Sequence, residues 1–166
     1  MKKRVMCVHT ELVRDGSVLY VGKDGKRSMT TTEEAADFAA SFFGSQDKEM
    51  LYICAVNVHF EPVLMEMVAK GSMNRCYVEP AEVFKSAILA DAYGIFCFHN
   101  HPGGVAKASK EDINVTARLE ACGVMLGIPL LDHIIISSLG EVYSIKEQDG
   151  EQLNETINRM CYKVSE

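Results

Sequence analysis

The stretch FHNHPGGVAKASKED, residues 98–112, gathers the side chains of this sequence that are best suited to chemistry. His99 and His101 are separated by one residue, so on a strand their imidazoles point to the same face. A proline and two glycines then turn the chain, and Ser109 and Asp112 fall in the first turn of a predicted helix. Two histidines and one carboxylate leave an open fourth position on zinc, which is typical of catalytic sites.

Each half of this pattern also has a simpler interpretation. Ser-x-x-Asp at a helix start resembles a capping box, and an acid in the first turn complements the helix dipole. His-x-His can equally lie in an exposed loop that binds nothing. The capping and metal roles are compatible, and the combined spacing H-x-H-x7-S-x-x-D favours a metal site at the rim of a strand.

Three other catalytic patterns are excluded by spacing. The HNH nuclease motif distributes its three residues over a hairpin and a helix, whereas here the three letters are adjacent. His9 is followed by Glu11 without the second histidine of H-E-x-x-H, which excludes a zincin. The combined zinc-deaminase signature, H-x-E together with P-C-x-x-C, is also missing, because no P-C-x-x-C occurs in the sequence.

The remaining candidates have weaker functional interpretations. His59 lies in a turn-like NVHFEP segment and is expected to be solvated. Asp132 and His133 interrupt an apolar strand, where they predict a satisfied core pair or, alternatively, a group that orients a metal ligand. Three methionines predict core or hairpin packing, with a peptide-binding surface as the alternative; they are Met65, Met67 and Met73.

Composition limits the classes of partner. The chain of 166 residues has 17 Lys and Arg against 23 Asp and Glu, a net charge of −6, and its basic run is confined to residues 2–4. Nucleic acid is therefore not an expected partner. No apolar stretch reaches the roughly 20 residues that span a bilayer. The first residues lack the apolar region of a secretory signal, so none is expected and a cytoplasmic location is predicted. The six cysteines form no C-x-x-C pair and predict buried, reduced thiols.

Apolar runs, helical periodicity and turn residues predict the elements that would position these residues. The expected strands are a hairpin over 4–21 with its turn at Asp15-Gly16, then 50–58, 63–71, 94–99 extended to His101, 129–137 and 141–145. The expected helices are 31–44 ending at Gly44, 80–92 opened by Pro80, 109–122 with Gly123 beyond its end, and 151–164. A turn is expected at 23–26. This order predicts one α/β (α+β) domain with a mixed sheet flanked by helices.

The motifs resemble a known family, the JAB/MPN metalloprotease superfamily with its JAMM signature, and within it the RadC-type proteins. The resemblance covers roughly residues 32–146, and its motifs keep their order and spacing. Its motifs here are Pro80-Ala-Glu82-Val83-Phe84-Lys85, His99-Asn100-His101-Pro102, Ser109-Lys110-Glu111-Asp112 and Leu130-Leu131-Asp132-His133-Ile134-Ile135. The chain departs from the family at Gly103, where serine is usual, and at Glu79, which replaces a common histidine. These departures affect loop shape more than the ligands.

The resemblance implies a single JAB/MPN-like domain that binds zinc through His99, His101 and Asp112. Ser109 would hydrogen-bond the water or the developing oxyanion. Glu49 would be the general base, because the family's acid opens the first core strand and Asp47-Lys48-Glu49 matches that position. From position alone, Glu49 would be an ordinary surface acid.

The expected organisation is an N-terminal hairpin extension over 1–30, the JAB/MPN domain over 31–146 and a C-terminal helix over 147–166, with no room for the helix-hairpin-helix segment that often precedes this domain. The expected function is a zinc-dependent hydrolase of the metallopeptidase or isopeptidase type, acting on a peptide or protein. Two alternatives stay open: a DNA-associated or scaffold protein that retains the fold, and a metal hydrolase of a non-peptide substrate.

Overall fold

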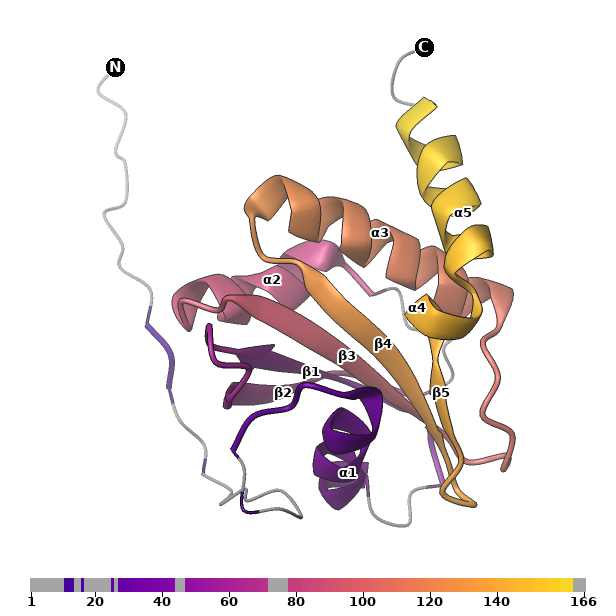
Figure 1. Ribbon diagram of the computed structural model, residues 1–166, viewed down its shortest axis with the longest axis horizontal. Helices are drawn as coiled ribbons and strands as arrows, with labels where there is room; N and C mark the ends of the chain where they lie inside the picture. The colour runs from indigo at the N-terminus through magenta and orange to yellow at the C-terminus, as the bar shows by residue number, and fades with distance from the viewer. Residues whose placement is uncertain are drawn as a thin grey trace, which may run out of the picture.

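One mixed sheet with helices on both faces forms the centre of the molecule (Figure 1). The computed structural model describes residues 27–43, 47–71 and 78–162, together with the short pieces 11–13, 16 and 25. The predicted α+β class with a mixed sheet is confirmed. The hairpin predicted over 4–21, the turn at 23–26 and the helix stop at Gly44 lie largely or wholly outside the described residues.

The sheet has five strands in the order β2-β1-β3-β4-β5. Their bounds are β1 Met50–Val56, β2 Pro62–Lys70, β3 Gly94–His101, β4 Leu130–Ser137 and β5 Val142–Ser144. β3 lies in the middle, antiparallel to β1 and parallel to β4. It is buried along its length except at its last residue, His101, which suits a near-continuous apolar run.

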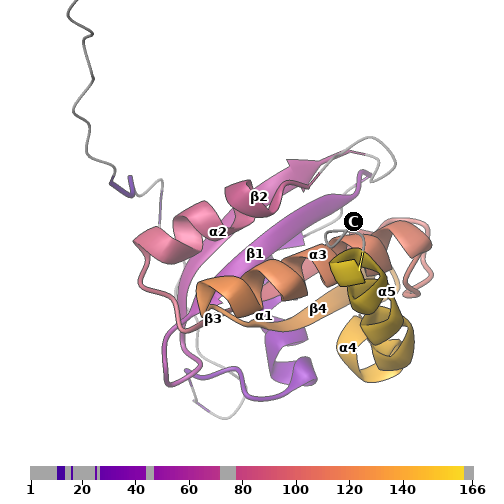
Figure 2. The ribbon, with the colours of Figure 1, turned by 90° about the horizontal axis from the view of Figure 1, so that it is seen from above.

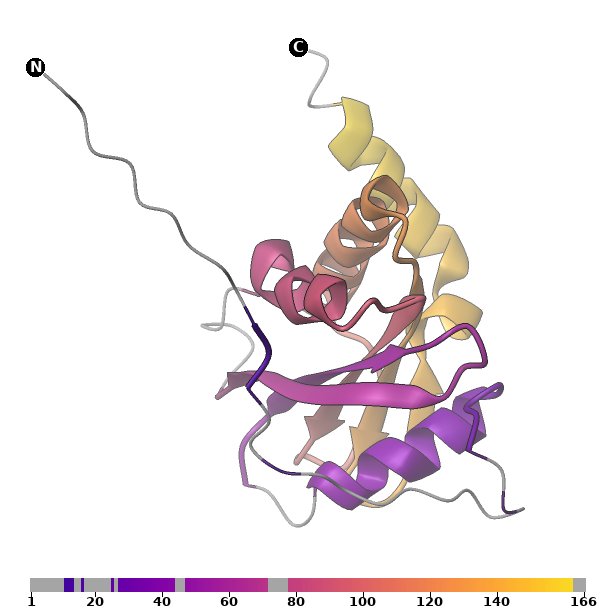
Figure 3. The ribbon, with the colours of Figure 1, turned by 90° about the vertical axis from the view of Figure 1, so that its left-hand side faces the viewer.

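The helices form a layer on each side of the sheet. Figure 3 shows α1 below the sheet and α2 and α3 above it, and Figure 2 shows α5 beside α3. Their bounds are α1 Thr32–Phe43, α2 Pro80–Leu89, α3 Lys110–Leu126, α4 Ile145–Gln148 and α5 Gly150–Tyr162. The short α4 was not predicted, and the other helices of the described chain begin within a residue or two of their predicted starts.

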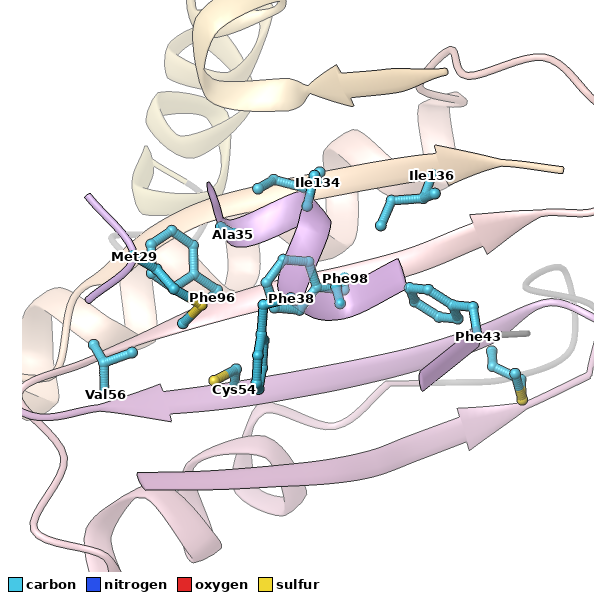
Figure 4. Packing of buried hydrophobic residues seen from close by; sticks show 13 residues of the cluster. Met29, Ala35, Phe38, Phe43, Cys54, Val56, Phe96, Phe98, Ile134 and Ile136 are labelled. Atoms are coloured by element: carbon cyan, nitrogen blue, oxygen red, sulfur yellow. The ribbon is translucent and has the colours of Figure 1, made fainter. Parts of the chain in front are cut away.

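The two faces of the sheet carry separate apolar clusters. On one face Phe38 of α1 packs over Phe96 and Phe98 of β3 (Figure 4). On the other face α2 and α3 cover the alternate residues of the same strands, among them Ile95 and Cys97. Because side chains alternate along a strand, His99 and His101 continue the second set and lie on the face that α2 and α3 cover.

The end of α3 differs from the prediction, because Gly123 is inside the helix and not beyond it. A Cβ at Gly123 would lie 2.6 Å from the carbonyl oxygen of Ile128, so the chain returning to β4 passes too close for any side chain. The helix ends three residues after it and is capped by Gly127, whose φ of 72° is left-handed. The glycine at 123 therefore marks a close approach within α3, and Gly127 provides the stop.

This close approach predicts the effect of a single methyl group. Replacing Gly123 with alanine should lower the free energy of unfolding by about 1–3 kcal/mol, because the clash with backbone outweighs the gain of about 1 kcal/mol in helix propensity. Urea denaturation would measure the loss. Val124→Ala, at an exposed position of the same helix, serves as the control and should change stability little. An alanine variant as stable as the original chain would contradict the close packing.

The smaller predictions about single residues are largely confirmed where the structure describes them. His59 is exposed in the turn after β1. Cys54 and Cys97 are buried, and burial raises the pKa of both thiols. Cys122 is only partly buried, so the prediction of a buried thiol is wrong there. Met65 packs against the core, whereas Met67 is 46% exposed on β2, an edge strand. Met73 lies outside the described residues.

Candidate metal centre

The two histidines lie close together at the C-terminal end of strand β3. His99 is fully buried and His101 is at the open end of the strand, with 18% of its side chain exposed. Their Nε2 atoms lie 2.8 Å apart. The prediction that the period of two brings these imidazoles together on one face is confirmed.

The carboxylate of Asp112 comes from the first turn of helix α3. Ser109 is the N-cap, and its hydroxyl accepts a hydrogen bond from the backbone N–H of Asp112 at 3.1 Å. Asp112 completes the capping box, because its Oδ2 accepts hydrogen bonds of 2.7 Å from both the backbone N–H and the hydroxyl of Ser109. The predicted cap therefore exists, and it holds the carboxylate in a fixed rotamer.

The other oxygen of this carboxylate faces the histidines. Asp112 Oδ1 is buried and has no hydrogen-bond partner among the described residues. It lies 3.5 Å from His99 Nε2, and Asp112 Oδ2 lies 3.9 Å from His101 Nε2. Tetrahedral zinc with ligand bonds of about 2.0–2.2 Å separates its ligand atoms by about 3.3 Å, so these distances are close to a ligand set. The group formed by His99, His101 and Asp112 could hold a metal ion.

The tautomer of His101 also suits a metal ligand. His101 Nδ1 lies 2.8 Å from the carbonyl oxygen of Val105 in the glycine-rich turn. A carbonyl only accepts, so Nδ1 carries the ring proton and donates it. When the imidazole is neutral, Nε2 is left as a lone pair directed at His99 and Asp112, as a metal ligand requires.

Burial keeps the inner histidine neutral. Desolvation, together with the nearby charge on His101, lowers the pKa of His99 to about 3. Desolvation likewise lowers the pKa of His133 well below its usual range, with His99 as the next cause. Both imidazoles are therefore unprotonated at neutral pH, and only an unprotonated imidazole nitrogen binds a metal.

These shifts predict how the protein, stripped of metal with a chelator, responds to acid. The unfolded chain binds protons at His99 and His133 below about pH 6.5, whereas the folded chain does not, so stability should fall as the pH drops below that value. Each group contributes up to about 1.4 kcal/mol per pH unit. Urea unfolding at neutral pH and about two units lower would measure the slope. Replacing the exposed His59 should leave it unchanged, and a pH-independent stability over this range would contradict the shifts.

His133 contacts the site directly, which sequence reasoning left open. Its Nε2 lies 2.8 Å from His99 Nδ1, and its Nδ1 lies 2.6 Å from the hydroxyl of Thr116 on α3. His133 and Asp132 are not a side-chain pair, because neighbouring residues of a strand point to opposite faces. Asp132 instead faces α1, where the hydroxyl of Thr32 lies 3.4 Å from its carboxylate, and burial raises its pKa.

Glu49 immediately precedes β1. β1 pairs Leu51 with His99, and the same antiparallel register, continued by two residues, would set Glu49 opposite His101 on the same face. Asn100, between the two histidines, points the other way and fixes this segment. Its side chain accepts a 2.6 Å hydrogen bond from Met50 N–H and donates one of 3.0 Å to the carbonyl of Lys48.

A cavity lies away from these residues. It has a volume of about 430 Å³ and opens at the N-terminal end of α1, and its lining residues include Thr31, Phe60 and Glu147. None of the residues that line it belongs to the group of His99, His101 and Asp112. Among the helices of the described residues, none is long and apolar enough to cross a membrane.

Comparison with known proteins gives matches along most of the chain. Residues 29–151 match the family model described as a RadC-like JAB domain. A UPF0758 protein of Clostridium acetobutylicum is 41% identical over 120 residues, which cover 72% of this chain and 52% of that protein. A UPF0758 protein of Finegoldia magna is 40% identical over 111 residues, covering 67% of this chain and 50% of that protein. The chain therefore spans about half the length of the curated relatives it matches.

Proposed function

This chain belongs to the family of RadC-like JAB domain proteins, and on that premise we propose that it is a zinc-dependent hydrolase of the metallopeptidase or isopeptidase type. The observation that carries the proposal is Asp112 Oδ1, a buried oxygen without a hydrogen-bond partner among the described residues. Leaving a buried carboxylate oxygen unsatisfied costs free energy. A cation held between Oδ1 and the two Nε2 atoms would satisfy it.

The ligand types favour zinc over magnesium and calcium. Magnesium and calcium prefer sets made only of oxygen, whereas neutral imidazole nitrogens with one carboxylate suit zinc. His99, His101 and Asp112 provide three ligand atoms within 4.8 Å of one another. Three protein ligands leave the fourth position of a tetrahedral ion for water or substrate, as hydrolysis requires.

When bound, zinc would acidify a water to a pKa near 7 and polarise the carbonyl under attack. Glu49 is proposed as the general base that accepts the proton of this water and returns it to the leaving amine. This role is supported by the strand register, which pairs Leu51 with His99 and points toward His101 when it is continued to Glu49. The hydrogen bonds of Asn100 to Met50 and Lys48, on either side of Glu49, support it as well.

Ser109 is proposed as a hydrogen-bond donor to the oxyanion that develops on the substrate carbonyl. Its hydroxyl now donates to Asp112 Oδ2, so it lies at the edge of the ligand set and would exchange this partner during the reaction. Its capping bond from Asp112 N–H uses the hydroxyl as an acceptor, and that bond would be kept. The cap and the catalytic donor are therefore compatible.

A peptide digestion with a chelator control tests the proposed activity. Protein loaded with zinc should cleave some members of a library of extended peptides or isopeptide-linked substrates, and stripping the metal should abolish the cleavage because the attacking water is no longer activated. Adding zinc back should restore it. Cleavage that persists in the stripped protein, or a zinc-loaded protein that cleaves no member, would contradict the proposal.

Gel-shift titration at two salt concentrations tests the rival class, a DNA-associated protein. Each phosphate contact contributes a slope of about −0.9 in log affinity against log salt. The net charge is −6, and Lys107 and Lys110 beside the site are balanced by Glu111 and Asp112. We expect weak binding that higher salt abolishes. Tight binding that survives higher salt, without chelator-sensitive cleavage, would favour the rival.

A further inference from the structure

We infer that Thr116 and His133 are positioning residues that hold the ring proton of His99 on Nδ1, so that its Nε2 lone pair faces His101 and Asp112. The importance of this for metal binding rests on the proposed function. The tautomer itself follows from contacts among residues of the described chain. Thr116 is a polar residue on the buried side of α3.

The three side chains form one buried row from helix to strand to strand. Thr116, His133 and His99 are each 0% exposed. Thr116 Oγ1 lies 2.6 Å from His133 Nδ1, and His133 Nε2 lies 2.8 Å from His99 Nδ1. No exposed surface lets water replace any of these partners, so each contact must be a hydrogen bond with one proton in it.

The hydrogen bonds of Thr116 decide which atom donates and which accepts in each contact. Its hydroxyl also lies 2.6 Å from the backbone carbonyl oxygen of Asp112, one turn earlier in α3. A carbonyl oxygen has no proton to give, so the single hydroxyl proton must lie between these two oxygens. The hydroxyl can then only accept from His133, and His133 must carry its own proton on Nδ1.

The remaining protons follow in order. A neutral imidazole with its proton on Nδ1 has a lone pair on Nε2, so His133 accepts a hydrogen bond from His99 Nδ1. His99 then has its lone pair on Nε2, the atom 3.5 Å from Asp112 Oδ1. The opposite arrangement would place a proton on His99 Nε2, at the point where the metal must bind. The helix carbonyl of Asp112 thus sets the tautomer of a ligand on β3, two hydrogen bonds away.

Two matched pairs of variants separate this role from simple packing. Thr116→Val keeps the shape but removes the hydroxyl, whereas Thr116→Ser keeps the hydroxyl. His133→Asn keeps a polar atom near Thr116 but loses the acceptor for His99, whereas His133→Gln can place an amide oxygen where Nε2 was. Packing alone would not rank serine above valine at 116 or glutamine above asparagine at 133.

The first measurement is the tautomer, read from long-range proton–nitrogen NMR correlations of the histidine rings in zinc-loaded protein. We expect His99 and His133 to carry their protons on Nδ1, and Thr116→Val to shift or mix the state of His133 while Thr116→Ser retains it. A proton on Nε2 of His133 in the original chain would overturn the inference.

The second measurement is zinc affinity by chelator competition. Thr116→Val and His133→Asn should weaken zinc binding by about 10–100-fold, the usual effect of removing a group that orients a metal ligand. Thr116→Ser and His133→Gln should recover most of it. Equal affinities within each pair would overturn the inference. Zinc binding without peptidase activity would contradict the proposed function but not the inferred roles of Thr116 and His133, because neither measurement depends on catalysis.

Discussion

Replacing His101 with alanine is expected to empty the metal site while leaving the fold in place. The original chain should bind one zinc ion, held by the three ligand atoms that the structure brings together. The variant should lose more than about 100-fold in affinity, because losing a ligand costs more than losing a residue that only orients one. Metal analysis after gel filtration, followed by chelator competition, would measure both proteins.

The position of His101 makes this variant a clean test. Its side chain is at the open end of β3, 18% exposed, so truncation there should change the far-ultraviolet circular dichroism little. His59→Ala removes an exposed histidine from the turn after β1 and should bind zinc like the original chain. If the original chain takes up no zinc when zinc is offered, or His101→Ala binds it as tightly, the ligand set proposed here is wrong.

Replacing Glu49 with glutamine should separate chemistry from metal binding. The amide cannot accept the proton of the attacking water, so hydrolysis should fall by about 10²–10⁴-fold while zinc content stays the same. Steady-state rates and metal content, measured on the same preparation, would show this. Glu66→Gln, at an exposed position of β2, is the matched control. If Glu49→Gln emptied the site, Glu49 would be a ligand and not the base.

Ser109→Ala gives a contrasting pattern in the same assays. It should slow hydrolysis and also lower the free energy of unfolding by about 0.5–2 kcal/mol, because the N-cap of α3 is lost. Glu49→Gln should have no such effect on stability. A fully stable Ser109→Ala variant would show that Asp112 can hold the helix start alone.

The sequence was sufficient to predict the parts of the site that depend on local geometry. The period of a strand brings His99 and His101 to one face, and S-x-x-D predicts the capping box that orients Asp112. Both follow from spacings of two and three residues, which a single strand or helix turn determines. The buried apolar runs likewise predicted β1, β3 and β4 because a strand covered on both faces shows little alternation.

The contact of His133 with His99 could not be predicted in this way. It depends on β4 lying next to β3 in parallel, and on a register shift after Ile95 that sets Cys97 beside His133. Neither is encoded in a local pattern. A weak signal did exist, because Thr116 follows Asp112 by four residues and so shares its side of α3. Likewise, only the folded chain shows that Ile128 passes over Gly123.

The ligands and their supports come from one continuous strand-helix-strand crossover, β3–α3–β4, whereas Glu49 precedes β1 in a separate hairpin. A ligand that binds only the native form stabilises whatever cooperative unit contains its contacts. Bound metal would therefore raise the free energy needed to open the crossover locally. The free energy needed to open the β1–β2 hairpin would stay closer to its value in the metal-free protein. Amide hydrogen exchange would divide this small domain into two units, with the metal ligands in one and the proposed base in the other.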